Sequence, residues 1–337
     1  MRCSRTSLLA AVSVTMAVCA AFPGVADAAP NPDDMTMVNV VKVQGLPWFN
    51  RMAVGVEGFA TRTGVQASQE GADDTSPQKQ VQLVADLIPR RPNAITVVPN
   101  SVAALEDVLG QARAQGITVV SHEATGIQNA DVDIEAFDNA AFGRQTIQGL
   151  AQCMGGQGDY VQFVGSVTMT THMQWVDAAH DMQLADFPGM NRIDGPVETG
   201  NDEPTAYAKA KELLAKYPNL RGFQGAASTD VPGIARAVRD AGLQDRTCVM
   251  GTAVPSVAAP YFTDGAIDKI FFWDPAMAGQ AQMQIALMLV QGQKIETGTD
   301  LNVPGYESLA KLDGYDNVFV GNAALEADAA TISAYQF

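Results

Sequence analysis

Short apolar runs alternate with longer amphipathic segments along most of the chain after residue 37. The runs have the length and composition of strands, whereas the longer segments repeat apolar residues at helical spacing. We predict strands at residues 38–43, 67–69, 94–98, 118–122, 161–165, 190–195, 222–225, 248–251 and 269–272. We predict helices at residues 78–87, 101–115, 143–153, 173–186, 204–216, 231–241, 257–264 and 277–291, and a helix-like pattern also follows Asn50.

This alternation predicts an α/β fold in which parallel strands are covered by helices on both faces. A first group of strand–helix units precedes residues 133–139 (DIEAFDN), and a second group follows them. The economical interpretation is two doubly wound lobes of similar size, joined by short hinge segments. Ligands of such sheets bind outside the carboxyl ends of the strands, so two facing lobes would enclose a cleft there.

Composition supports a globular chain with a large core. The 337 residues are 47% hydrophobic and 17% charged, which is enough apolar material for two lobes. The formal net charge of −16 would repel a phosphate backbone, and no basic stripe in the sequence offsets it. The sequence therefore argues against a nucleic-acid partner.

The N-terminus has the pattern of a secretory signal peptide. Arg2 and Arg5 form a basic region, residues 8–22 form an apolar region, and residues 26–28 (Ala-Asp-Ala) resemble a cleavage site. We expect residues 1–28 to be removed and the protein to be periplasmic or otherwise extracytoplasmic. A lipoprotein anchor at Cys19 is the alternative. No later apolar stretch approaches the roughly 20 residues that span a bilayer.

Removal of this leader would leave Cys153 and Cys248 in an oxidising compartment. Cys153 falls near the predicted end of a helix and Cys248 at the start of a strand. These positions share one edge of an α/β layer, so a disulfide is geometrically plausible. Two separate buried thiols are the alternative.

Motifs of enzymatic chemistry are missing from the sequence. It has no G-x-S-x-G elbow and no phosphate-binding loop, and the glycine-rich stretch at residues 155–165 precedes its strand instead of following it. The three histidines, His122, His172 and His180, do not have the spacing of metal ligands. We therefore expect no catalytic residues, no metal and no cofactor.

Polar and aromatic residues instead follow most of the predicted strands directly. They include Gln44, Trp48, Phe49, Asn50, Asn100, Ser101, His122, Glu123, Ser166, Thr171, His172, Ser228, Thr229, Thr252, Trp273 and Asp274. Many of these residue types also cap helices or form turns, which is a structural explanation for any one of them. A carbohydrate ligand explains them jointly, because a sugar packs its C–H face on an aromatic ring and bonds its hydroxyls to charged and amide groups.

Several stretches carry a resemblance to a known family, namely KVQGLPWFNRMAVG, SVTMTTHMQWVDAA, FFWDPAMAGQ and the closing ISAYQF. With the leader and the two lobes, they make residues 38–337 resemble ABC-transporter solute-binding proteins of the type I periplasmic class. Within that class, the chain is most similar to the branch that holds the autoinducer-2-binding protein of the Lsr system and the rhamnose-binding proteins.

The resemblance implies that the chain crosses between its lobes three times, near residues 137–139, 274–276 and 303–306. The implied N-terminal lobe comprises residues 36–138 and 276–304, and the implied C-terminal lobe residues 139–275 and 305–337. It also implies a hinge motion that closes the lobes on a ligand.

The resemblance implies ligand-binding residues as well. Lys42 stands where the autoinducer-2 binder has a lysine, and Glu123 replaces an aspartate of that protein. Thr171 and His172 replace an Asp-Gln pair, whereas the Trp48-Phe49-Asn50 run is more similar to the rhamnose-type binders. The predicted ligand-binding residues are Lys42, Trp48, Phe49, Asn50, Asn100, Glu123, Thr171, His172, Ser228, Thr252, Trp273 and Asp274.

We therefore expect a monomeric binding subunit that carries a small neutral sugar, deoxysugar or polyol to an ABC permease and performs no chemistry. The alternative is an autoinducer-2-type signal binder, which Lys42 and Glu123 favour and Thr171 and His172 oppose. An exported α/β hydrolase is a third alternative, and the missing nucleophile–base set argues against it.

Overall fold

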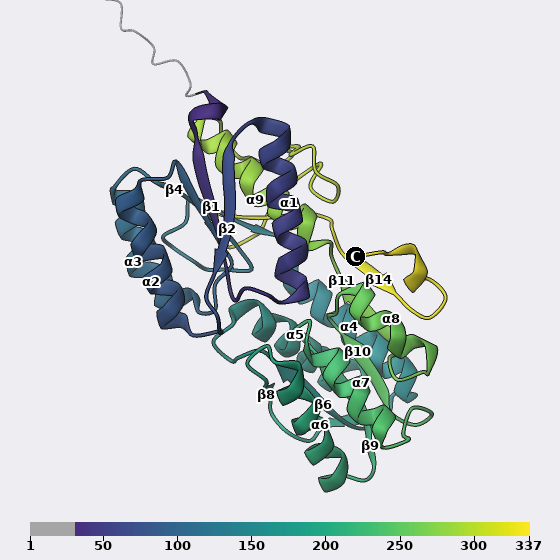
Figure 1. Cartoon of the computed structure of the whole chain (residues 1–337). Coiled ribbons are helices and arrows are strands. Elements are labelled where there is room, and N and C mark those ends of the chain that lie inside the picture. The colour runs from purple at the N-terminus through teal and green to yellow at the C-terminus, as the bar shows by residue number, and fades with distance from the viewer. Residues whose placement is uncertain (1–30) are drawn as a thin grey trace, which may run out of the picture.

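The computed structural model describes residues 31–337, which form two α/β lobes (Figure 1). Each lobe contains a mainly parallel sheet with helices on both faces, so the predicted fold class is confirmed. The predicted leader at residues 1–28, with Cys19, lies outside the described residues.

Every predicted strand and helix overlaps an element of the structure. The strands are β1 (Thr36–Val41), β2 (Gln66–Gly71), β3 (Ala94–Val97), β4 (Thr118–His122), β5 (Val132–Glu135), β6 (Gln157–Val164), β7 (Gly189–Arg192), β8 (Val197–Glu198), β9 (Leu220–Gly225), β10 (Cys248–Gly251), β11 (Lys269–Phe272), β12 (Ala310–Lys311), β13 (Val318–Val320) and β14 (Leu325–Ala327). The α-helices are α1 (Pro47–Thr63), α2 (Pro77–Leu87), α3 (Val102–Ala114), α4 (Asn139–Met154), α5 (Thr170–Asp186), α6 (Glu203–Lys216), α7 (Asp230–Asp240), α8 (Pro255–Thr263) and α9 (Pro275–Val290). Short 3-10 turns are η1 (Pro32–Asp34), η2 (Ile88–Arg90) and η3 (Ile332–Ala334).

The two sheets have the strand order of doubly wound lobes. The N-terminal sheet runs β12-β13-β5-β4-β3-β1-β2, and β12 is antiparallel to β13. The C-terminal sheet runs β14-β11-β10-β9-β6-β7, with β8 beside β6 and β14 antiparallel to β11. Central strands such as β3 and β10 are buried throughout, which explains why they form continuous apolar runs instead of alternating.

Helices pack in pairs over the sheets. In the N-terminal lobe α1 packs on α9 and α2 on α3, and in the C-terminal lobe α4 packs on α5 and α6 on α7. Glycine permits two of these close approaches, because an added Cβ would lie 1.9 Å from the Ala276 carbonyl oxygen at Gly55 and 2.2 Å from the Trp175 carbonyl oxygen at Gly143. These contacts fix α9 and α5 beside the interlobe region.

The third crossing between the lobes differs from the prediction. The first two crossings lie at residues 136–138, between β5 and α4, and at residues 273–274, between β11 and α9. The third lies at residues 321–324 instead of 303–306, because β13 pairs with β5 and only then does β14 pair with β11. Residues 305–320 therefore belong to the N-terminal lobe, and their assignment to the C-terminal lobe was wrong.

Two local features also differ from the sequence-based expectation. The segment at residues 133–139, expected to be only a connection, contains most of the buried strand β5. Trp48 and Phe49, expected in a loop, lie in the first turn of α1, which begins at Pro47. Proline is well suited to the first helical position because its missing N–H would have no partner there.

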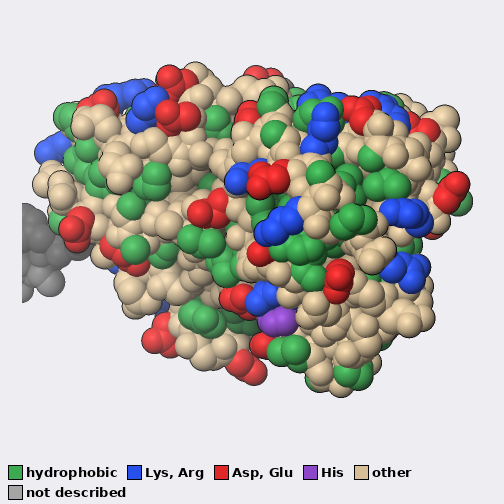
Figure 2. All heavy atoms as spheres, turned by 90° about the horizontal axis from the view of Figure 1, so that it is seen from below, with side chains coloured by type: hydrophobic (Ala, Val, Ile, Leu, Met, Phe, Trp, Pro, Cys, Tyr) green, Lys and Arg blue, Asp and Glu red, His purple; other side chains and the backbone are tan. Residues whose placement is uncertain are grey.

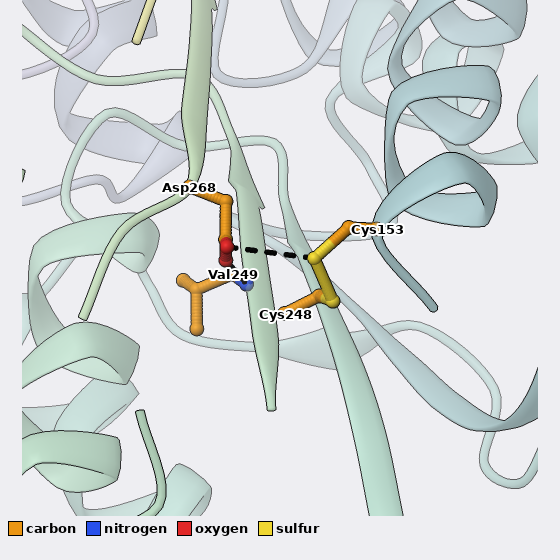
Figure 3. The surroundings of a disulfide bond; sticks show 4 residues. All are labelled: Cys153, Cys248, Val249 and Asp268. Atoms are coloured by element: carbon orange, nitrogen blue, oxygen red, sulfur yellow. Dashed lines mark hydrogen bonds between the residues drawn. A yellow bond between two sulfur atoms is a disulfide. The ribbon is translucent and has the colours of Figure 1, made fainter. Parts of the chain in front are cut away.

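A disulfide joins Cys153, at the end of α4, to Cys248, the first residue of β10 (Figure 3). The Cα atoms lie 6.1 Å apart, and the adjacent Asp268 accepts a hydrogen bond of 2.7 Å from the Val249 amide. Within residues 31–337, the two cysteines and Asp268 are the one grouping of side chains with the spacing of a metal site. Sulfur atoms bonded to each other are not thiolate ligands, so the grouping is explained by the disulfide.

Figure 2 shows the molecule from below relative to Figure 1, and on that face acidic and basic side chains are interspersed with apolar ones. None of the helices in the described part of the chain combines the length and the apolar character that a bilayer span requires.

Candidate ligand-binding site

A cavity lies between the lobes, where the carboxyl ends of strands from both sheets face each other. Its space, counted out to the mouth, is about 340 Å³. The N-terminal lobe contributes Lys42, Leu46, Trp48, Phe49 and Glu123. The C-terminal lobe contributes His172, Trp175, Asn201, Ala226, Ala227, Ser228 and Thr252, and the second crossing contributes Trp273.

The lobes are closed over this cavity. The Thr168 hydroxyl of the C-terminal lobe donates a hydrogen bond of 3.3 Å to the Asn100 carbonyl of the N-terminal lobe. The Thr75 hydroxyl donates a bond of the same length in the opposite direction, to the Gly200 carbonyl. Both lobes therefore contribute to one enclosed site.

A buried ion pair forms one wall of the cavity. Lys42 follows β1 and Glu123 follows β4, and the Lys42 ammonium donates to a Glu123 carboxylate oxygen. Each side chain is only 4% exposed. The Asn100 side chain, at the end of the intervening strand β3, donates to the Lys42 carbonyl at 2.7 Å and holds its backbone in place. The parallel sheet thus brings together residues that are far apart in the sequence.

The environment of Glu123 keeps it ionised. Burial raises the pKa of this carboxyl, but the charge of Lys42, with a smaller contribution from His122, more than offsets burial and holds the pKa below its usual value. The Glu123 backbone also has a left-handed conformation, with φ of 56°. Such conformations are costly for residues other than glycine and often occur at binding sites.

A second pair of acids lies behind Glu123 in the N-terminal lobe. Burial raises the pKa of Glu135, and the neighbouring Asp133 raises it further. Glu135 accepts hydrogen bonds from the Thr125 amide and hydroxyl. Because a buried carboxyl with a raised pKa tends to be protonated, Glu135 adds little negative charge next to the ion pair.

His172 is a neutral hydrogen-bonding group at the opposite wall. Burial, with repulsion from Lys42, lowers its pKa to about 3. Its Nδ1 accepts a hydrogen bond of 3.1 Å from the Gly165 amide at the end of β6. A neutral imidazole whose Nδ1 accepts must carry its proton on Nε2, so His172 can act as a donor through that atom.

All three tryptophans of the protein line the cavity. Trp273 packs edge-on against Trp48, with ring centroids 4.6 Å apart, and against Trp175 at 5.7 Å. The Trp175 ring stacks on His172, and its Nε1 donates to Asn139 at 2.8 Å. The buried Nε1 of Trp273, in contrast, has no acceptor within residues 31–337. An unpaired buried donor is costly, and a ligand oxygen would satisfy it.

A buried carboxyl supports the loop that carries Ala226, Ala227 and Ser228. Asp230, at the start of α7, accepts hydrogen bonds from the Ala227 amide at 2.8 Å and from the Thr199 hydroxyl at 2.7 Å. Burial raises its pKa to about 7 in spite of these bonds. The loop therefore presents small side chains to the cavity from a fixed backbone.

Four of the predicted site residues lie outside the cavity lining. Asn50 is exposed and bonds the Gly45 carbonyl, and Asn100 supports Lys42 as described above. Thr171 is buried in the first turn of α5. Asp274 caps α9 and forms a two-pronged ion pair with Arg51, at 2.8 and 2.6 Å. The remaining predicted residues, from Lys42 to Trp273, are brought together in the lining.

Sequence reasoning missed five lining residues, namely Leu46, Trp175, Asn201, Ala226 and Ala227. Trp175 could have been found, because it lies one turn after His172 on the same helix. Asn201 follows the two-residue strand β8, which carries no periodic signal. The leucine and the alanines are of residue types that usually indicate core.

The fold and the cavity together define a two-lobed binding protein that encloses a small ligand. Residues 37–294 match the family described as the periplasmic binding protein domain, and the chain belongs to that family. It is thus a substrate-binding protein and not an enzyme.

Several characterised proteins are similar to this chain over most of its length. A D-ribose/D-allose-binding protein of Pseudomonas aeruginosa is 26% identical, with 89% of this chain and 95% of that protein covered. A solved solute-binding protein from Clostridium phytofermentas with bound L-rhamnose has a TM-score of 0.83 at 19% identity and covers 89% of this chain and 98% of its own. LsrB from Clostridium saccharobutylicum in complex with AI-2 has a TM-score of 0.83 at 18% identity, and the match covers 90% of this chain and 100% of that one.

Proposed function

We propose that this protein is the extracytoplasmic binding subunit of an ABC importer and that it takes up a small neutral sugar, deoxysugar or polyol. The observation that carries the proposal is the cavity walled by Trp48, Trp175 and Trp273, in which the Trp273 indole N–H has no acceptor within residues 31–337. Aromatic faces beside fixed polar groups are the combination that sugars require. The relatives named for ribose, allose and rhamnose support this class of ligand.

The charges at the cavity favour an uncharged ligand. Lys42 and Glu123 neutralise each other, and His172 is neutral at physiological pH. An ionic ligand would have to break the buried pair or enter without a counter-charge, and either would be costly. Hydroxyl groups can instead bond to the free lone pairs and protons of these side chains.

Binding can be measured without an added label, because all three tryptophans line the cavity. We expect fluorescence changes and calorimetric heats with at least one compound from a panel of pentoses, hexoses, deoxyhexoses and polyols. No binding across this panel would contradict the proposal. Trp48→Ala and Phe49→Ala should each weaken binding about tenfold or more, as buried aromatic contacts commonly do. Tyr315→Ala, which lies outside the cavity lining, is the matched control and should bind normally.

An autoinducer-2-type signal is the second candidate ligand. Lys42 and Glu123, the two positions that favoured it in the sequence, both line the cavity. A reporter assay on material released by heating the purified protein separates the two candidates, because only a signal ligand would activate the reporter.

A further inference from the structure

A second cavity, the vestibule, adjoins the proposed sugar cavity. It has about 540 Å³ of space to its mouth and lies between the start of α1 in the N-terminal lobe and the starts of α6, α7 and α8 in the C-terminal lobe. Leu46, Asn201 and Ser228 line both cavities, so the two cavities are adjacent. A ligand larger than one sugar ring would reach the vestibule by passing between these three side chains.

The vestibule is lined mainly by rigid apolar side chains. They are Leu46, Pro47, Pro204, Pro232, Val254 and Val257. Proline and valine lose little side-chain entropy when a ligand packs on them, so such a surface favours an apolar group.

The polar groups of the vestibule exclude anions but can accept or donate single hydrogen bonds. Asp202 and Glu203 are acidic, and Glu203 is already paired with Arg236 at 3.3 Å. Thr229 is 9% exposed and Asn201 8%, and within residues 31–337 the Thr229 hydroxyl and the Asn201 side-chain oxygen have no partners. The Thr229 hydroxyl can donate to a bridging oxygen of the ligand, and the Asn201 oxygen can accept a hydrogen bond from a ligand hydroxyl.

We infer that the natural ligand is a glycoside, with its sugar ring in the first cavity and an uncharged alkyl or aryl aglycone in the vestibule. This inference rests on the proposed sugar-binding function. It adds that the aglycone contributes to affinity through contacts that a free monosaccharide does not make.

The test compares each free sugar of the panel with its methyl, butyl and phenyl glycosides by calorimetry. A phenyl glycoside of the sugar that binds is expected to bind about tenfold more tightly than that sugar. Tenfold corresponds to about 1.4 kcal/mol, which removal of about 55 Å² of apolar ligand surface from water would supply.

Two variants that fill the vestibule make the test specific. Val257 and Pro204 line the vestibule but not the sugar cavity, and Pro204 is exposed. Val257→Phe and Pro204→Phe should remove the tenfold advantage while leaving affinity for the free sugar within about twofold. Val54→Phe, at an exposed site on α1, is the control and should keep the advantage.

The outcomes separate the two proposals. If free sugars bind but no glycoside binds more tightly, or if the advantage survives in both filled variants, the glycoside inference is wrong and sugar binding stands. If neither the sugars nor their glycosides bind, the sugar-binding function itself is wrong, and the inference fails with it. Binding of phenyl glycosides alone would contradict the proposed uptake of a free sugar, and its loss in the filled variants would still support the vestibule as an aglycone site.

Discussion

Separating the buried charges of Lys42 and Glu123 gives a prediction whose size follows from the structure. Each side chain is 4% exposed, so a partner left alone would be a bare charge in a dry site. Such a group can avoid that penalty by becoming neutral, which limits the cost to the free energy of its protonation change. The loss in free energy of unfolding therefore has an upper limit, which depends on pH.

For Lys42→Met, Glu123 must take up a proton. Relative to its usual pKa of about 4.3, this costs about 3.7 kcal/mol at pH 7 and about 1 kcal/mol at pH 5. For Glu123→Gln, the buried Lys42 ammonium is left without its partner, and removal of one partner of a buried pair commonly costs about 4 kcal/mol of stability. The first variant should thus recover stability in acid.

The double variant carries neither charge. We expect it to lose only about 2 kcal/mol of unfolding free energy at pH 7, from altered packing and hydrogen bonding. The sum of the two single-variant losses should therefore exceed the loss in the double variant by about 6 kcal/mol. Urea unfolding at pH 5, 7 and 9, followed by tryptophan fluorescence and far-UV circular dichroism, measures all of these values. Lys311→Met, which removes one partner of an exposed pair with Asp316, is the control and should behave like the wild type.

Two results would refute this reasoning. Single losses below about 1 kcal/mol at pH 7 would show that water reaches the pair, since exposed pairs contribute about that much. A loss in Lys42→Met that does not shrink from pH 7 to pH 5 would show that the Glu123 carboxylate finds another partner. In either case the closed, dry arrangement would not describe the ligand-free protein in solution.

Three further predictions follow from other buried groups. Because the pKa of His172 is lowered to about 3, ligand affinity should stay constant between about pH 5.5 and 8, and a histidine-like titration in calorimetry would contradict this. Native Asp230, with its pKa raised to about 7, keeps a proton that the unfolded chain has lost, so its contribution to stability should fall as pH rises from about 4 to about 7. Asp230→Asn should lack this contribution and gain about 4 kcal/mol in free energy of unfolding over the wild type across that window, whereas a difference that does not change with pH would be the opposing result. Cys153→Ala removes the disulfide, which joins positions 95 residues apart in the sequence, and should lower the free energy of unfolding by about 4 kcal/mol. Dithiothreitol should destabilise the wild type but not this variant.

The sequence was sufficient for the main architecture because the central strands are parallel and buried on both faces. Such strands form apolar runs that stand out from the amphipathic helices around them. The third crossing was misplaced because β12, β13 and β14 are two or three residues long and show no periodicity. Their lobe is decided by long-range pairing, for example of β13 with β5.

Parts of the site were predictable for a related reason. In parallel sheets, the residues that follow the strands meet at one edge, which places Lys42 and Glu123 together without any knowledge of coordinates. Trp273 follows a strand of the other sheet, and two facing lobes bring that edge to the same cleft. Asp274 shows the limit of this rule. It follows β11 as expected, but Arg51, distant in sequence on α1, binds both of its oxygens. No local pattern reveals such a partner.

The pairing of Asp274 has a consequence for the ligand. With Asp274 held by Arg51 and Glu123 held by Lys42, each acid nearest the cavity has its own cation, so a neutral ligand meets no uncompensated charge. The Arg51 guanidinium also lies 4.6 Å from the centre of the Phe337 ring, and the Phe337 carbonyl accepts a hydrogen bond from the Ser256 amide of α8. Arg51 therefore links α1 of the N-terminal lobe to the C-terminal lobe beside the second crossing. The same arginine thus pairs the acid beside the second crossing and adds a contact between the lobes to the bonds of Thr75 and Thr168.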